Sequence, residues 1–186
     1  MQTIENSLLQ VSVNENGAGI AHLISKKDNY DYLDNGEKQG KAIISFPEID
    51  RENNWANKLP WTVVDKGDAR VSLTLIDSAE SYKQFPYHFE IMTTYSIEGT
   101  QLNISFDLKN NSNKKMPFTL KLALPQLAPI TDESISKIVM ADADHTATLE
   151  STDLKLQQDD DMINCSVNNV ELDGETEQIF KLALTL

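Results

Sequence analysis

The stretch Ser81–Leu124, SYKQFPYHFEIMTTYSIEGTQLNISFDLKNNSNKKMPFTLKLAL, decides the fold. At its centre, apolar residues alternate strictly with polar ones over seven positions: Leu102, Ile104, Phe106 and Leu108. A period of two is typical of a β-strand with one buried face. The runs before Glu98-Gly99 and after Pro117 repeat the pattern. The stretch therefore predicts three consecutive antiparallel strands that form a meander.

Shorter alternating runs, bounded by Gly, Asn, Asp or Pro, occur on both sides of this stretch: Leu9–Val13, Val71–Leu75, Ile163–Val167 and Phe180–Leu186. No segment combines the apolar spacing of an amphipathic helix with capping residues at both ends, and Asp77–Gln84 is interpreted as a polar loop. The pattern predicts eight to twelve short strands and an all-β, antiparallel β-sandwich. Because 186 residues suffice for one core, residues 1–186 are expected to form a single domain.

The charge balance excludes two classes of partner. The sequence contains 16 Lys and Arg residues and 29 Asp and Glu residues. The resulting net charge of −13 repels nucleic acid and anionic membrane surfaces. The first residues, MQTIENSLLQVSV, lack a basic region followed by an apolar one. No later segment approaches the ~18 apolar residues of a membrane span. We therefore expect a cytoplasmic protein that binds neither nucleic acid nor membrane.

No motif in the sequence indicates a cofactor. Gly17-Ala18-Gly19 is not followed by a helical pattern, so it is not a phosphate-binding loop. The single cysteine, Cys165, lies in an alternating run where a small buried residue fits, and no histidine is near it in sequence. We expect Cys165 to be a core residue and not a nucleophile.

Several phrases in the deciding stretch occur together in one known family. They are Phe85-Pro86-Tyr87-His88-Phe89-Glu90, Tyr95-Ser96-Ile97-Glu98-Gly99, Lys109-Asn110-Asn111 and Met116-Pro117-Phe118-Thr119. In order and spacing they resemble the aldose 1-epimerase (galactose mutarotase) superfamily, in particular its bacterial LacX-like branch. The resemblance covers most of residues 3–124 and the last strand, so the chain is identified as a shortened, divergent member. It implies a reduced form of the galactose mutarotase-like supersandwich.

The resemblance also implies a sugar-binding site. Phe46-Pro47-Glu48-Ile49-Asp50-Arg51 is similar to the family phrase F-P-x-x-G-R, whose arginine reaches the bound sugar. Arg51 is therefore the predicted sugar contact. Trp55 and Trp61 follow closely and are the other candidate substrate-binding residues. An indole that stacks on a sugar would lie on a concave face, whereas a core indole would not.

The family's acid and base residues are not found. The resemblance implies two histidines and a C-terminal glutamate, but Asn53–Lys58 passes into the next strand without a His-Gly phrase. Ala123 or Leu124 stands in the place of the second histidine. Ile163–Asn169 contains no matching glutamate. No catalytic residue is therefore assigned.

The three histidines that are present do not rebuild this pair. His22 and His88 are interpreted as structural or surface residues at strand positions. His145 is close to Asp142 and Asp144, but further ligands at a fixed spacing are lacking, so no metal site is assigned.

Three functions remain open from the sequence. The favoured one is an aldose 1-epimerase-like carbohydrate-binding protein of sugar metabolism, catalytically impaired, with a monosaccharide ligand. The second is an active epimerase that acts on an unusual sugar or sugar phosphate through replaced acid and base groups. The third is a domain that binds no sugar and serves as an interaction module, for example in a homodimer.

Overall fold

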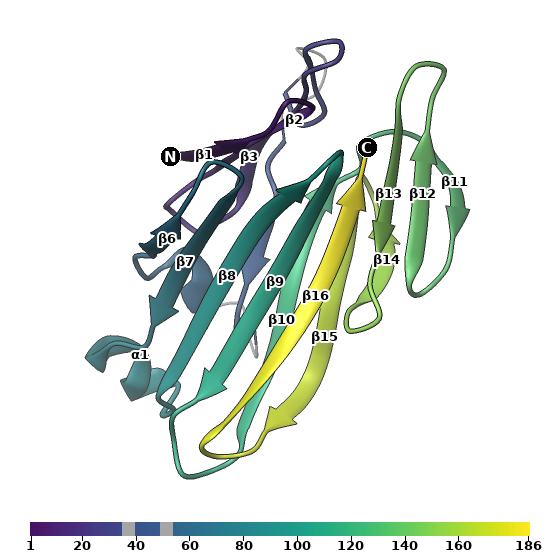
Figure 1. Cartoon of the computed structure of the whole chain (residues 1–186). Helices are drawn as coiled ribbons and strands as arrows, with labels where there is room; N and C mark the ends of the chain where they lie inside the picture. The colour runs from purple at the N-terminus through teal and green to yellow at the C-terminus, as the bar shows by residue number, and fades with distance from the viewer. Residues whose placement is uncertain (35–39, 49–53) are drawn as a thin grey trace.

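The computed structural model describes residues 1–34, 40–48 and 54–186. Figure 1 shows a large sheet in front of a smaller one, with a third sheet at the N-terminal end. All strand pairs are antiparallel. The predicted all-β antiparallel sandwich is confirmed, with sixteen strands in the described ranges where eight to twelve were expected.

The large sheet has eight strands in the order β11-β12-β13-β16-β9-β8-β7-β6. These strands are β6 (Thr62–Lys66), β7 (Arg70–Ile76), β8 (Phe89–Glu98), β9 (Gln101–Asn110), β11 (Ile130–Glu133), β12 (Lys137–Ala141), β13 (Thr146–Glu150) and β16 (Thr176–Thr185).

The other two sheets have four strands each. The second sheet, in the order β14-β15-β10-β5, contains β5 (Ile43–Ser45), β10 (Met116–Pro125), β14 (Lys155–Asp159) and β15 (Met162–Leu172). The third sheet, in the order β1-β2-β3-β4, contains β1 (Gln2–Glu5), β2 (Leu9–Val13), β3 (Ile20–Ser25) and β4 (Tyr30–Asp31). No helix in the described part of the chain is long and apolar enough to cross a membrane.

The predicted meander is wrong in its third strand. β8 and β9 pair over their full lengths, but β10 crosses to the second sheet, where it pairs with β15 and β5. The buried Asn110 side chain holds this crossover, because its Nδ2 donates to the carbonyls of Lys114 (2.8 Å), Leu172 (3.0 Å) and Asp173 (3.1 Å). The strands on either side of the polar turn therefore share a core but not a sheet.

A second crossover lies at the same end of the molecule (Figure 1). The turn at Asp173-Gly174 joins β15 to β16, which belong to different sheets. A Cβ atom on Gly174 would lie 2.6 Å from the carbonyl carbon of Asn113, so the two crossovers are in direct backbone contact. Only glycine permits this approach.

The interpretation of Asp77–Gln84 as a loop is also wrong, because it contains the helix α1 (Ala79–Gln84). Ser78 and Ser81 form a reciprocal capping box: the Ser78 hydroxyl accepts from Ser81 N (3.1 Å), and the Ser81 hydroxyl accepts from Ser78 N (2.9 Å). Six residues are too few to produce a helical period in the sequence. The other helical element is the single 3₁₀ turn η1 (Trp55–Asn57).

The core lies between the sheets and reaches from the third sheet to the last strand. The predicted inner face of β9 is confirmed, since none of its four apolar side chains is more than 2% exposed. Cys165 is fully buried, and this burial raises the pKa of its thiol to about 12. The thiol is therefore a neutral core group, as expected.

Candidate functional site

The outer face of the second sheet carries a polar cluster centred on Lys121 of β10. Because the even-numbered residues from Phe118 to Leu124 point into the core, Thr119, Lys121 and Ala123 point outward. Ser45 of β5 and Ser166 of β15 are the register partners of Lys121 on its two sides. We call this surface the polar face; it comprises Ser45, Glu48, Asn54, Thr119, Lys121, Ser166 and Asn168.

An ion pair lies at the centre of the polar face. Lys121 Nζ is 2.7 Å from Glu48 Oε1, and the two side chains are 26% and 30% exposed. Glu48 is held beside β10 because the carbonyl of Pro47, the preceding residue, accepts from Thr119 N at 2.7 Å. Partial burial strengthens this pair relative to a fully hydrated one.

Hydroxyl and amide groups flank the ion pair on both sides. Asn54 Nδ2 donates to Ser45 Oγ at 3.2 Å. On the other side, Asn168 Nδ2 donates to Ser166 Oγ at 2.9 Å. The face thus offers an ammonium donor, a carboxylate acceptor and neutral groups of both kinds. These groups can both donate and accept hydrogen bonds.

The predicted site residues have different positions. Arg51 lies outside the described residues. Trp55, in η1, is 3% exposed, and Lys58 Nζ lies 5.2 Å from the centroid of its ring. Trp61 is 6% exposed, and its Nε1 donates to the carbonyl of Ala56 at 2.8 Å. The structure places both indoles in the core, so neither presents an open ring face to a ligand.

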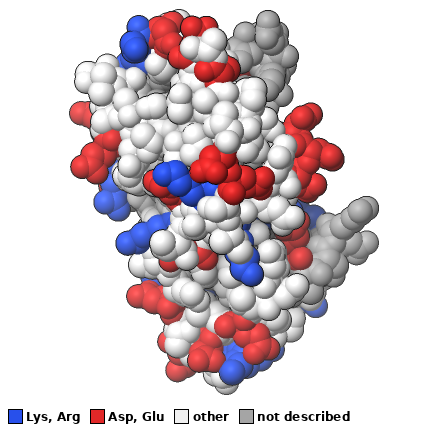
Figure 2. All heavy atoms as spheres, turned by 90° about the vertical axis from the view of Figure 1, so that its right-hand side faces the viewer, with Lys and Arg blue, Asp and Glu red and all other residues white. Residues whose placement is uncertain are grey.

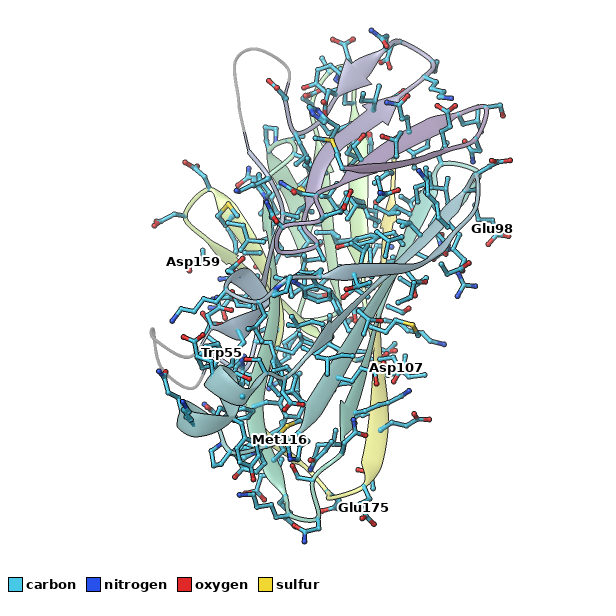
Figure 3. All side chains as sticks on the ribbon, turned by 90° about the vertical axis from the view of Figure 1, so that its left-hand side faces the viewer. Trp55, Glu98, Asp107, Met116, Asp159 and Glu175 are labelled. Carbon is cyan, nitrogen blue, oxygen red and sulfur yellow. The ribbon has the colours of Figure 1, made fainter. Side chains whose placement is uncertain are left out.

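The buried Nε1 of Trp55 has no hydrogen-bond partner among the residues that the structure describes. A buried donor without a partner costs about 1–3 kcal/mol. Figure 3 shows Trp55 on the side of the molecule that carries the hairpin of Asp159, which belongs to the second sheet. Trp55 is tied to the opposite edge of that sheet, because its backbone N–H donates to the carbonyl of Phe46, directly after β5, at 2.7 Å.

All three histidines lie in described ranges and pair with carboxylates outside the polar face. His22 Nδ1 is 2.7 Å from Asp31, and His88 Nδ1 is 3.0 Å from Asp77. His145 Nε2 is 3.1 Å from Asp28. No group of three or more potential metal ligands occurs within the described ranges.

Ala123 and Leu124, the two positions considered for the second family histidine, point to opposite sides of β10. Ala123 points outward beside Asn164 of β15 and Ile43 of β5, whereas Leu124 is buried in the core. Ala123 therefore occupies the surface position, and its methyl group can neither donate nor accept a proton.

Sequence reasoning missed the Lys121–Glu48 pair. Lys121 is the single charged residue in β10, on the outward side of the alternation, and this was a usable signal. Glu48 offered no comparable signal because its distance from Lys121 depends on the pairing of segments 73 residues apart.

The family model for aldose 1-epimerase matches residues 53–122, which include most of the phrases that carry the resemblance. The predicted family resemblance is confirmed. A comparison of the sequence with curated proteins gives no match.

Solved structures share the fold over nearly the whole chain. A galactose mutarotase-like protein from Lactobacillus casei has a TM-score of 0.81 at 20% identity, with 100% of this chain and 99% of that chain covered. A galactose mutarotase related enzyme from Lactobacillus acidophilus has a TM-score of 0.70 at 13% identity, with 99% and 96% covered. A galactose mutarotase-like protein from Clostridium acetobutylicum has a TM-score of 0.67 at 11% identity, with 98% and 93% covered. At these identities the likeness is one of fold.

Proposed function

We propose that this aldose 1-epimerase-like protein binds a monosaccharide on the polar face and is catalytically impaired. The observation that carries the proposal is the half-buried Lys121–Glu48 pair, flanked by the Ser45–Asn54 and Ser166–Asn168 hydrogen bonds. Charged donors and acceptors that are partly shielded from water form the stronger hydrogen bonds to ligand hydroxyls. The sequence-predicted contact from Arg51 would add a further donor.

Impaired catalysis follows from the acid and base groups that the polar face offers. Mutarotation needs one group to protonate the ring oxygen and another to take the proton of the anomeric hydroxyl, and each contributes about 10²–10⁴-fold. Ala123 supplies neither. Lys121 and Glu48 hold each other at 2.7 Å, so neither is free for proton transfer while the pair is intact.

The same ion pair also favours the alternative of a working epimerase. If a sugar separated the two groups, the Glu48 carboxylate could accept the anomeric proton and the Lys121 ammonium could donate to the ring oxygen. Lys121→Met and Glu48→Gln variants distinguish this alternative from simple binding.

The test combines polarimetry with binding on the purified protein. We expect no acceleration of α-D-glucose or α-D-galactose mutarotation above the buffer rate. In titrations followed by ¹H–¹⁵N NMR, the same sugars should shift amides of β10 and β15 weakly. Lys121→Met should reduce that binding about 10- to 150-fold, because a charged hydrogen bond is worth about 1.5–3 kcal/mol. The matched control is Lys109→Met, on the outer face of the large sheet.

Each contrary result points to one of the alternatives. Turnover that disappears in Glu48→Gln would overturn the hypothesis that the protein is catalytically impaired, and would establish an active epimerase. The absence of both turnover and sugar-dependent shifts would favour the interaction module. Light scattering would then test the predicted homodimer.

A further inference from the structure

A cavity of about 330 Å³ lies where the third sheet, the β12–β13 turn and the C-terminus meet. Figure 1 shows these three elements at the upper end of the molecule. We call it the Tyr32 cavity, after the residue that follows β4 and lines it. It shares no residue with the polar face. Its volume is at the lower end of the range for small-molecule sites.

His145 forms a fixed wall of the Tyr32 cavity. Its Nε2 is 3.1 Å from Asp28, which is 117 residues away in sequence, and its Nδ1 is 3.6 Å from Asp142. The Tyr30 ring stacks on the imidazole, with centroids 3.8 Å apart and an interplanar angle of 16°. The wall is therefore held by contacts on both ring nitrogens and on the ring face.

Tyr32 contributes a largely buried phenol side chain to the cavity lining. Tyr32 is 6% exposed and lines the cavity. Burial, followed by the nearby Asp28 carboxylate, raises the pKa of Tyr32 to about 12. The phenol is thus neutral near pH 7 and able both to donate and to accept a hydrogen bond.

The remaining lining combines polar and apolar residues, and it includes the cationic Lys27. Thr100 and Thr146 contribute hydroxyls, and Asp144 contributes a carboxylate for which no partner is found in the described part of the chain. Leu9 and Leu186 contribute apolar surface. Figure 2 shows carboxylates gathered at the upper end of the molecule, where the β12–β13 turn lies. Such acceptors favour a ligand that brings hydrogen-bond donors.

We propose that the Tyr32 cavity is a second binding site, which takes a hydroxyl-rich ligand of monosaccharide size. Ligand hydroxyls would donate to Asp144 and pair with the hydroxyl of Tyr32. The C–H face of the ligand would pack on Leu9 and Leu186. This site is separate from the polar face, so the proposal stands or falls independently of the one made for Lys121.

The experiment is a ¹H–¹⁵N NMR titration with D-glucose and D-galactose as probes. We expect shifts at the amides of Thr100, His145 and Thr146 that report one dissociation constant. Tyr32→Phe removes only the hydroxyl and should raise this constant about 3- to 10-fold, the equivalent of one neutral hydrogen bond. The matched control is Tyr82→Phe, at a tyrosine on α1 that should leave the constant unchanged. Should Tyr32→Phe fail to fold, Thr146→Val on the cavity rim gives the same test.

The two sites give distinguishable outcomes. Shifts confined to β10 and β15, and lost in Lys121→Met, would overturn the Tyr32 site and leave the proposed function standing. Shifts at the Tyr32 cavity that survive Lys121→Met and weaken in Tyr32→Phe would support the second site. Cavity shifts that are the same in Tyr32→Phe and the parent would overturn the assigned contact, and the absence of any shift would overturn both proposals.

Discussion

The two faces of β9 differ in burial and polarity. The inner face is sealed, and its four apolar side chains lie in the core. The outer face carries Asn103, Ser105, Asp107 and Lys109, all half-buried. The alternation of apolar and polar side chains along β9 thus places residues needed for folding on one face. Residues that form the surface lie on the other face. On β10, the same separation places Lys121 on a candidate binding face.

The largest expected effect comes from placing a charge on the inner face. Ile104→Asp should leave the protein unfolded at 25 °C, because an unpaired buried carboxylate costs several kcal/mol against a typical total stability of about 5–15 kcal/mol. The volume-conserving Ile104→Leu should cost less than about 1.5 kcal/mol. Thermal melts followed by circular dichroism measure both changes.

The matched control places the same charge one residue further along. Ser105→Asp lies on the outer face directly opposite Lys181, and should change the free energy of unfolding by no more than about 0.5 kcal/mol. Similar melting of Ile104→Asp and Ser105→Asp would mean that the two faces do not differ.

A smaller effect is expected at the end of β9, where the chain leaves the large sheet. Asn110→Ala removes three donated hydrogen bonds and the acceptor for Ser112 N, and leaves carbonyls without partners at both crossovers. We expect a loss of about 2–4 kcal/mol in urea unfolding. Asn111→Ala, the exposed neighbour, is the control and should be nearly neutral. Equal losses in the two variants would show that Asn110 does not tie the crossovers together.

The smallest effect concerns Asp107 on the outer face (Figure 3). Burial raises the pKa of this carboxyl, with Glu177 adding to the shift, and its Oδ1 has no hydrogen-bond partner in the described part of the chain. A raised carboxyl pKa in the folded state destabilises the protein above that pKa. This destabilisation is lost as the pH falls below the ordinary value of 3.8.

Asp107→Asn should therefore raise the melting temperature slightly at pH 7, and the gain should shrink as the pH is lowered toward 4. The exposed Asp68→Asn is the control and should show no such pH dependence of its effect. A gain from Asp107→Asn that is the same at both pH values would contradict the role of its charge.

The sequence alone predicted only part of the candidate site. The phrase beginning at Phe46-Pro47 led to the region of the proposed site, because Glu48 lies within it. The indoles of Trp55 and Trp61 were candidates for an open face, and only the structure places them in the core. The depth of a side chain depends on which elements cover it, and this is not encoded in its own neighbours along the chain.

What the sequence determined by itself was local: which residues form strands, which side of each strand is apolar, and where the polar turns fall. These follow from the two-residue repeat of an extended backbone. The partner of each strand was decided by tertiary structure alone. β9 and β10 have the same pattern and adjoin in sequence, yet Asn110 directs them into opposite sheets. The Lys121–Glu48 pair and the His145–Asp28 pair also depend on tertiary structure. They join residues that are 73 and 117 positions apart in sequence, and these residues come together only when the sheets pack.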